Sequence, residues 1–154
     1  MIRLTNFQFV FENGFAIKLE NTSKIYDLHN RGLFQGFYYN TADNELQMYW
    51  WFNEDPDVIT VNPGYGFELV MRGVDYLEVA PRDPEMPSNE NETLSAISYM
   101  FHDDNLADFL HNGMIPVYRP EVNPSEQFHL LFIFRGGLMI RVNAAEAEFV
   151  VRAV

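Results

Sequence analysis

The sequence predicts a mainly β protein: an antiparallel β-sandwich or flattened β-barrel built from hairpins, with one short helix near residues 104–112. Three observations favour this class. Many short apolar runs alternate with polar residues at a period of two, turn-forming residues recur about every eight to twelve positions, and three pairs of runs flank a compact turn. For a chain of 154 residues, we expect a single globular domain over 1–154.

The first hairpin is predicted near the N-terminus, where apolar residues alternate over 7–11 and again over 15–19. A two-residue turn would place these two sets on opposite faces. A three-residue turn at 12–14 pairs Phe9 with Ile17 and brings both sets onto one face. We therefore expect the three-residue turn.

The second hairpin is predicted over residues 33–52, with its turn at 41–44. Pairing Asn40 with Glu45 sets the register, and this register places Gly36 opposite Tyr49. The residues expected to face the core are Leu33, Phe37, Met48, Trp50 and Phe52. The residues expected to face outward are Tyr38, Tyr49 and Trp51, with Phe34 opposite Trp51.

The middle of the chain is less regular. A short strand is predicted at 24–28, and strands at 67–72 and 74–80 are joined or bulged at Gly73. Residues 93–101 fit the apolar spacing of a helix and also that of a strand, and their composition favours a strand.

The best helix signal covers residues 104–112, with Asp103 or Asp104 as the N-cap and Gly113 beyond the end. A final strand is predicted at 147–151.

The C-terminal hairpin, residues 127–142, is expected to organise the fold. A two-residue Gly136–Gly137 turn would pair Ile133 with Ile140. The first strand of this hairpin is apolar on both faces, which is typical of a central strand covered on both sides. Its row of phenylalanines therefore needs a second layer: another sheet, the helix, or another copy of the chain.

Composition limits the classes of function. The chain has no cysteine, which excludes disulfides and fits a reducing compartment, and we expect a cytoplasmic location. No run approaches the roughly 18 apolar residues of a membrane-spanning helix, so no membrane association is expected. The net charge of −12 repels nucleic acid and anionic membranes and suits either solubility or a basic protein partner.

Catalytic motifs are missing from the sequence. There is no nucleophile motif, no Walker A sequence and no GxGxxG, so we assign no catalytic residue, expect no cofactor and favour a protein that is not an enzyme. A metal site could draw on His102, Asp103 and His111, because imidazole and carboxylate suit zinc or iron. Their spacing matches no metal motif, and the favoured interpretation is a capping carboxylate and an exposed histidine at a helix start, so no metal is assigned.

The strongest anomaly is the aromatic content of the second hairpin. We select Tyr38, Tyr49, Trp51 and Phe34 as candidate binding residues. These side chains could be covered by a second layer of the protein, form a protein interface, or line a pocket for an apolar or sugar-like ligand.

The leading hypothesis is a non-enzymatic binding module that uses an aromatic sheet face and an acidic surface to hold a basic protein partner. The alternative is a β-barrel-like protein, or an enzyme, that binds a small molecule in an aromatic pocket. Homodimerisation through an open sheet edge or face is also compatible with the pattern.

Overall fold

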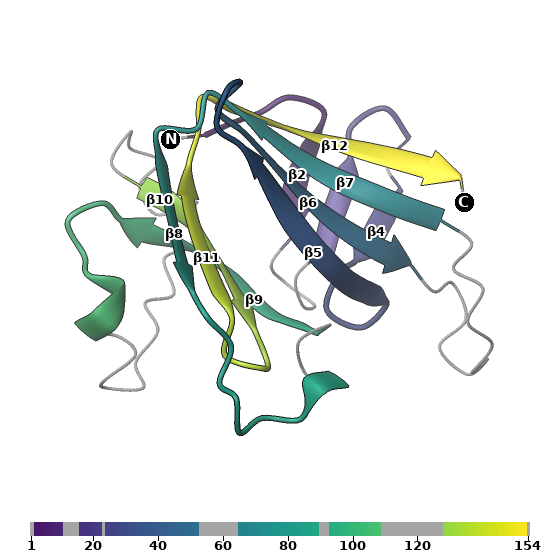
Figure 1. Cartoon of the computed structure of the whole chain (residues 1–154). Helices are drawn as coiled ribbons and strands as arrows, with labels where there is room; N and C mark the ends of the chain where they lie inside the picture. The colour runs from purple at the N-terminus through teal and green to yellow at the C-terminus, as the bar shows by residue number, and fades with distance from the viewer. Residues whose placement is uncertain are drawn as a thin grey trace.

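The structure is a computed structural model that describes residues 2–10, 16–22, 24–52, 65–89, 93–108 and 128–153. Its strands form three sheets, which are antiparallel except where β1 pairs with β12 (Figure 1). The five-stranded sheet has the order β1 (Arg3–Leu4), β12 (Glu146–Ala153), β7 (Tyr65–Arg72), β6 (Glu45–Phe52) and β5 (Gly32–Asn40). The four-stranded sheet has the order β8 (Tyr76–Ala80), β11 (Met139–Asn143), β10 (Phe128–Phe134) and β9 (Leu94–Phe101). The three-stranded sheet has the order β2 (Phe7–Val10), β3 (Ala16–Leu19) and β4 (Ile25–Asp27).

The three sheets pack as a sandwich around one core. The inner face of the five-stranded sheet is covered in part by the three-stranded sheet, where the Tyr26 ring lies 5.4 Å from that of Phe52. The four-stranded sheet covers another part, where the Phe34 ring stacks on Phe134 with centroids 4.3 Å apart. Each sheet is open, with two edge strands, so the predicted mainly β class is confirmed in its sandwich form.

Two chain connections, β7 to β8 and β11 to β12, cross between the five-stranded and the four-stranded sheets at the same bend. Strand β7 pairs with β12 in the five-stranded sheet, and β8 pairs with β11 in the four-stranded sheet. At the bend, the Ala145 amide donates to the Arg72 and Gly73 carbonyls, and the Asp75 amide donates to Asn143. Gly73 has a φ of +66°, a left-handed conformation that glycine adopts at little cost. The strands predicted on either side of Gly73 therefore belong to different sheets.

The C-terminal hairpin has a different register from the one predicted. Phe132, not Ile133, is paired with Ile140. The Phe134 amide donates to the Leu138 carbonyl, which closes a three-residue turn, and Gly137 takes a φ of +90°. The two-residue turn was wrong because only the second glycine is needed in the positive-φ position.

The corrected register groups the phenylalanine row of β10 with Leu138, Ile140 and Val142 on the core side. The five-stranded sheet supplies the second layer that this row requires. On the other face of β10, Leu131 and Ile133 form a smaller cluster with Leu106. The prediction that the strand is buried on both faces is confirmed.

The first hairpin has the predicted register, because Phe9 pairs with Ile17. Its turn lies outside the described residues. The second hairpin follows the prediction from the Asn40–Glu45 pair as far as Gly36 opposite Tyr49. The register then shifts at a bulge between Phe34 and Gly36, where Gly36 has a φ of +143°.

The bulge reverses the faces of the residues before it. Phe34 pairs with Trp50 instead of Trp51 and turns into the core, where it is 6% exposed. Leu33, expected in the core, is exposed on the outer face. One extra residue in a strand has this effect because side chains alternate between the two faces. Phe37 lies after the bulge and keeps its predicted side of the strand, but it is 38% exposed.

The remaining elements agree with the sequence in part. Residues 94–101 form β9, so the preference for a strand is confirmed, and β4 and β12 lie where short strands were predicted. A helical turn begins at Leu106, and its N-cap is Asn105, whose Oδ1 accepts from the Ala107 amide at 3.0 Å. Asp103 and Asp104 are therefore not the cap, and residues 109–112 lie outside the described ranges. In the ranges that are described, no helix is long and apolar enough to cross a membrane.

Candidate functional site

The outer face of the five-stranded sheet carries three aromatic side chains: Tyr38 on β5, and Tyr49 and Trp51 on β6. We call this group the aromatic face. Tyr38 is 59% exposed and Trp51 is 42% exposed, whereas Tyr49 is half-buried. The neighbouring Trp50 points the other way and is buried in the core. Three of the four predicted binding residues therefore share one solvent-facing surface.

A shallow hollow lies beside Trp51. Gly66 on β7 lies between Trp51 on β6 and Arg152 on β12. Because it has no side chain, it leaves a gap between the side chains of these two residues. The hollow has a volume of about 450 Å³. Its lining consists of Gln35, Tyr49, Trp50, Trp51, Gly66, Phe67, Glu68 and Arg152. Aromatic rings thus stand next to one carboxylate and one guanidinium.

The charged groups of the hollow are paired with each other. Arg152 Nη2 lies 3.3 Å from Glu68 Oε2, and the arginine side chain is largely exposed. Burial raises the pKa of Tyr49, and the nearby Glu68 carboxylate raises it further, so the phenol stays protonated. Its hydroxyl donates to Gln47 Oε1.

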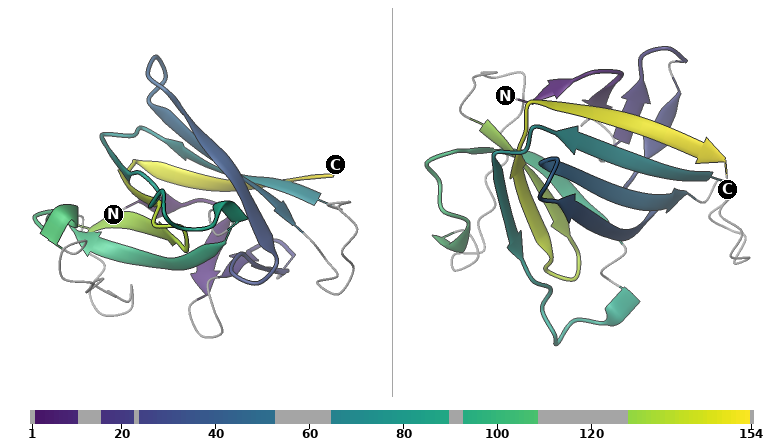
Figure 2. Two further views of the ribbon diagram at one scale, coloured as in Figure 1. Left: turned by 60° about the horizontal axis from the view of Figure 1, so that its bottom comes forward. Right: turned by 45° about the horizontal axis from the view of Figure 1, so that its top comes forward.

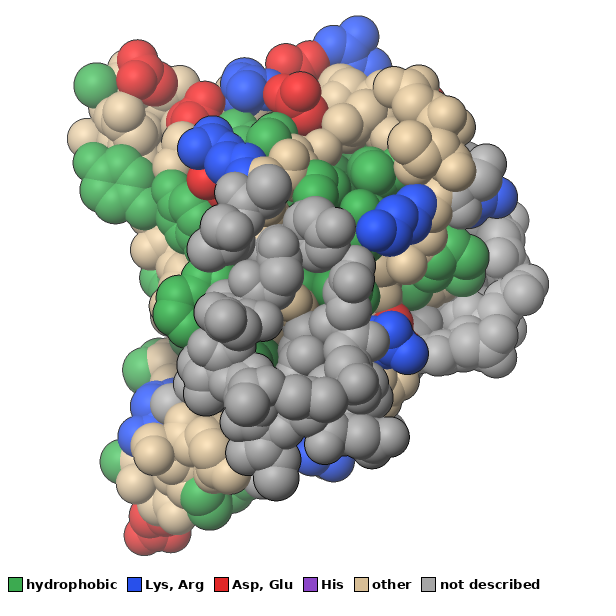
Figure 3. Space-filling model, turned by 90° about the vertical axis from the view of Figure 1, so that its right-hand side faces the viewer, with side chains coloured by type: hydrophobic (Ala, Val, Ile, Leu, Met, Phe, Trp, Pro, Cys, Tyr) green, Lys and Arg blue, Asp and Glu red, His purple; other side chains and the backbone are tan. Residues whose placement is uncertain are grey.

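Carboxylates elsewhere on this sheet are also matched with arginines. Arg72 Nη1 lies 2.9 Å from Glu148 Oε2, and Arg72 Nε lies 3.4 Å from Glu45 Oε2. Arg3 bonds to Glu146. On the side of the molecule seen in Figure 3, acidic side chains likewise lie next to Lys or Arg near the top of the view. The outer face therefore offers aromatic contact area with locally balanced charge.

Phe34, the fourth predicted binding residue, is not part of the aromatic face. Its ring lies 5.0 Å from Trp50 and 4.3 Å from Phe134, inside the core. The bulge at Gln35 is the physical reason, because it rotates Phe34 to the inner face of β5.

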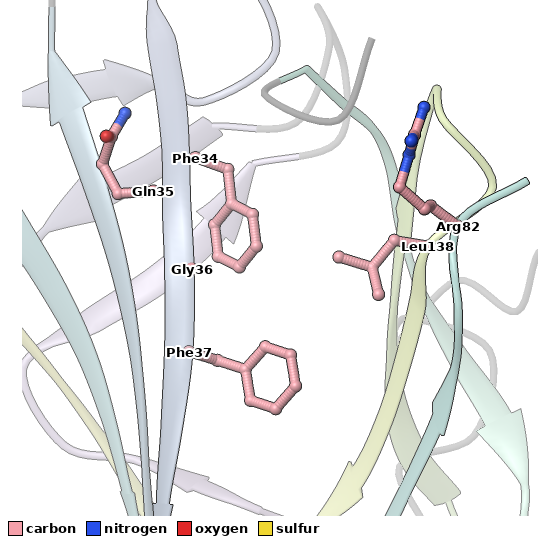
Figure 4. A pocket seen from close by; sticks show the side chains of 6 residues that line it. All are labelled: Phe34, Gln35, Gly36, Phe37, Arg82 and Leu138. Carbon is pink, nitrogen blue, oxygen red and sulfur yellow. The ribbon is translucent and has the colours of Figure 1, made fainter. Parts of the chain in front are cut away.

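A cleft opens between the two large sheets next to β5. It has a volume of about 360 Å³ and is lined by Phe34, Gln35, Gly36, Phe37, Arg82 and Leu138. Phe34 and Phe37 project from β5 toward Leu138 across the gap, whereas Gln35 points to the opposite side of the strand (Figure 4). The β5–β6 hairpin tip stands clear of the other sheet (Figure 2, left), so the sandwich is wedge-shaped on this side.

A buried arginine on the far face of the four-stranded sheet was missed by sequence reasoning. Arg141 is 2% exposed. Its Nε donates to His129 Nδ1 at 3.0 Å, and its Nη atoms donate to the carbonyls of Phe101, His102 and Asp104. Nη1 also lies 3.5 Å from Glu78 Oε2. The only signal in the sequence was a charge between Ile140 and Val142.

The guanidinium of Arg141 has no donor left for a ligand. It carries five N–H groups, and four hydrogen bonds together with the Glu78 carboxylate supply five acceptors. The arginine ties the turn at 101–104 to the sheet. Burial and the adjacent Arg141 charge lower the pKa of His129 to about 4, so the imidazole is neutral and can accept the Nε proton. This cluster is structural.

Two of the three predicted metal residues lie in the described part of the chain. His102 Nε2 lies 3.0 Å from Asp103 Oδ1, and both side chains are exposed. His111 lies outside the described residues. Among the residues that are described, no three His, Cys, Asp or Glu side chains come close enough to hold a metal ion.

Comparison with protein-family models, with curated proteins and with solved structures finds no significant match. The accessible surfaces of the molecule are therefore the guide to its function. Two of them are the aromatic face with its hollow and the cleft beside β5.

Proposed function

We propose that this protein is a non-enzymatic binding module that docks a basic protein partner on its aromatic face. The observation that carries the proposal is that Tyr38, Tyr49 and Trp51 share one outward surface, with a hollow beside Tyr49 and Trp51, although the core is filled without them. Tyrosine and tryptophan are enriched at interface hot spots, where a large ring gives much contact area with few rotatable bonds.

Net charge supports a basic partner. The chain carries −12, a charge that accelerates encounter with a cationic protein over distances comparable to the Debye length. Once the partner arrives, the local arginine–glutamate pairs contribute little attraction, and the aromatic rings supply the contact area. The charge therefore governs the association rate, and the aromatic face governs the lifetime of the complex.

The alternative, a small-molecule site in an aromatic pocket, has less support. An enclosed cavity between the sheets would favour it, but the residues between them form one contiguous buried cluster. The hollow at Gly66 and the cleft at Phe37 are both open surface features. Such shallow sites suit a protein surface better than a ligand that must be largely surrounded.

The test compares quantitative affinity capture from cell extract by the wild type, Trp51→Ala and Ile25→Ala. Ile25 is a matched control because it is an exposed apolar residue, at 54% against 42% for Trp51, on β4 of another sheet. A partner bound through the aromatic face should lose about tenfold or more in affinity with Trp51→Ala, and Ile25→Ala should bind normally.

The purified partner must then be basic, and its association rate must fall as salt rises. Equal binding to all three forms of the protein would contradict the proposal. So would an association rate that does not change with ionic strength.

A further inference from the structure

Strand β5 is an open edge. It ends the five-stranded sheet, so within the described part of the chain one of its two rows of backbone N–H and C=O groups has no strand neighbour. Of the described strands, six lie at sheet edges, and β5 is the longest of them at nine residues. The edge strands β1 and β4 have only two and three residues. Long edges attract additional strands because their hydrogen-bonding groups are already aligned.

The sequence of β5 lacks the usual protection of an edge. Proteins commonly place lysine, other charges or proline on edge strands to prevent pairing with other chains. Residues 32–40 read GLFQGFYYN, with no charge and no proline. The bulge at Gln35 interrupts the strand once, and it leaves the regular stretch Gly36–Asn40 beyond it.

The other long edge strand is different. β9 has eight residues, but most of its side chains are buried, and the Leu94 carbonyl at its start bonds to His29 Nδ1 at 2.6 Å. On β5, by contrast, Leu33, Phe37 and Tyr38 are each between 38% and 59% exposed. These three residues expose apolar surface on both faces of the same edge strand.

The cleft supplies a place for alternate side chains of an added strand. Phe37 lines it on the β5 side, and Leu138, just before β11, faces it from the opposite side (Figure 4). Val79, on the edge strand β8 of the four-stranded sheet, is also exposed at 38%. Because successive side chains of a strand point to opposite faces, a strand beside β5 would place every second side chain in this cleft.

We infer that an extended segment of a basic protein partner adds to the edge of β5 as a further strand. The inference rests on the proposed function and specifies how that partner is held. Its apolar side chains, at alternate positions, enter the cleft at Phe37. Its basic side chains face outward, where the ring of Tyr38 can accept a cation–π contact.

A second copy of this chain is the weaker occupant. Each copy carries −12, so edge-to-edge pairing would bring two strongly acidic molecules together. A segment of about five residues spans roughly 17 Å, which matches the regular part of β5 after the bulge. Such a segment needs no large complementary domain.

Synthetic peptides test the inference on the full ¹⁵N-labelled chain. The probe is a nine-residue peptide with valine or phenylalanine at every second position and lysine at the others. One comparison peptide has glutamate in place of lysine, and another has the same composition with the alternation removed. The lysine peptide should shift the amide resonances of residues 33–40 saturably, and both comparison peptides should bind at least about tenfold more weakly.

Backbone methylation identifies the mode of binding. In a paired strand, every second N–H points at β5 and the others point away. N-methylation of one alternate set should therefore abolish binding, whereas methylation of the other set should change it less than about threefold. Tyr38→Lys should weaken binding about tenfold by protecting the edge, and Ile25→Lys, the matched surface control, should not.

Several results would overturn strand addition at β5: equal effects of the two methylation sets, no β5 shifts at millimolar peptide, or dimerisation of the free chain through β5. Shifts centred on Tyr49, Trp51 and Gly66 would also overturn it but would leave the aromatic-face proposal intact. If Trp51→Ala bound a captured partner as tightly as the wild type, the proposed function itself would be wrong.

Discussion

Arg141 Nε donates a hydrogen bond to His129 Nδ1 across 3.0 Å, joining two neighbouring strands on the outer face of the four-stranded sheet. The bond requires a neutral imidazole, because a protonated Nδ1 would be a donor facing a donor. The charge of Arg141 and the burial of His129 both oppose protonation. A tilted ring contact completes the arrangement, since the Tyr76 ring lies 4.6 Å from the imidazole at an interplanar angle of 34°.

The hydrogen bond between Arg141 and His129 predicts that the fold loses stability in mild acid. The pKa of His129 is lowered from 6.5 to about 4, so below pH 6.5 the unfolded chain takes up a proton that the folded chain does not. The stabilisation is fully present above pH 6.5 and is lost as the pH falls toward 4, by up to about 3 kcal/mol. The other ionisable groups that influence His129 are Asp75, Glu78 and His102.

Urea unfolding at pH 7, 5 and 4 measures the effect, with His129→Gln as the reference. Glutamine can accept the Arg141 hydrogen bond through its amide oxygen but does not titrate in this range. The wild type should lose more stability than the variant as pH falls. Parallel curves for the two proteins would show that His129 does not carry the effect.

Arg141→Met should destabilise the protein by about 3–5 kcal/mol, because it leaves Glu78 and three backbone carbonyls without their buried donor. Arg152→Met is the matched control. Arg152 forms one ion pair with Glu68, its side chain is 66% exposed, and its loss should cost less than about 1 kcal/mol. Denaturant midpoints of both variants would check this, and similar values would contradict the structural role of Arg141.

Trp50→Ala and Trp51→Ala should separate stability from binding. Trp50 is buried against Phe34 and Phe67, so its truncation should cost about 3–5 kcal/mol. Trp51 is on the outer face, and its truncation should cost about 1 kcal/mol or less. Thermal melting would measure both, and a larger loss with Trp51→Ala would show that the faces of β6 are assigned incorrectly.

Gly73→Ala should strain the bend between the sheets in two ways. Its φ of +66° costs a non-glycine residue about 1–2 kcal/mol. An added Cβ would also lie 2.9 Å from the Ala145 Cβ. The double variant Gly73→Ala, Ala145→Gly should relieve only the steric part, with a coupling energy of about 0.5 kcal/mol or more. Additive losses in a double-mutant cycle would rule out the contact.

The sequence was most informative where a turn had one favourable solution. Faces and register agreed for Phe9 and Ile17, because only a three-residue turn placed both apolar sets together. Alternation does not decide the turn length at Gly136 and Gly137, because β10 is apolar on both faces and two glycines also suit a two-residue turn. In the structure only Gly137 needs a positive φ, and Phe132 rather than Ile133 meets Ile140.

The candidate site was predicted in part for a related reason. Tyr38, Tyr49 and Trp51 lie after the bulge or on the partner strand, so simple alternation from the 41–44 turn placed them correctly. Phe34 lies before the bulge, and alternation alone could not reveal the extra residue at Gln35. Arg141 was missed because its partners are the backbone carbonyls of a distant turn, which leave no pattern in the sequence.

The bend that links the two large sheets brings together strands that are made far apart in time during synthesis. Next to the bend, Arg72 on β7 forms an ion pair with Glu148 on the neighbouring strand β12, although the two lie 76 positions apart along the chain. The central strand β7 must therefore remain without one of its neighbours until the ribosome has delivered β12. Pairings of such long range form slowly, and the apolar strands made earlier stay open to aggregation or to chaperones in the meantime.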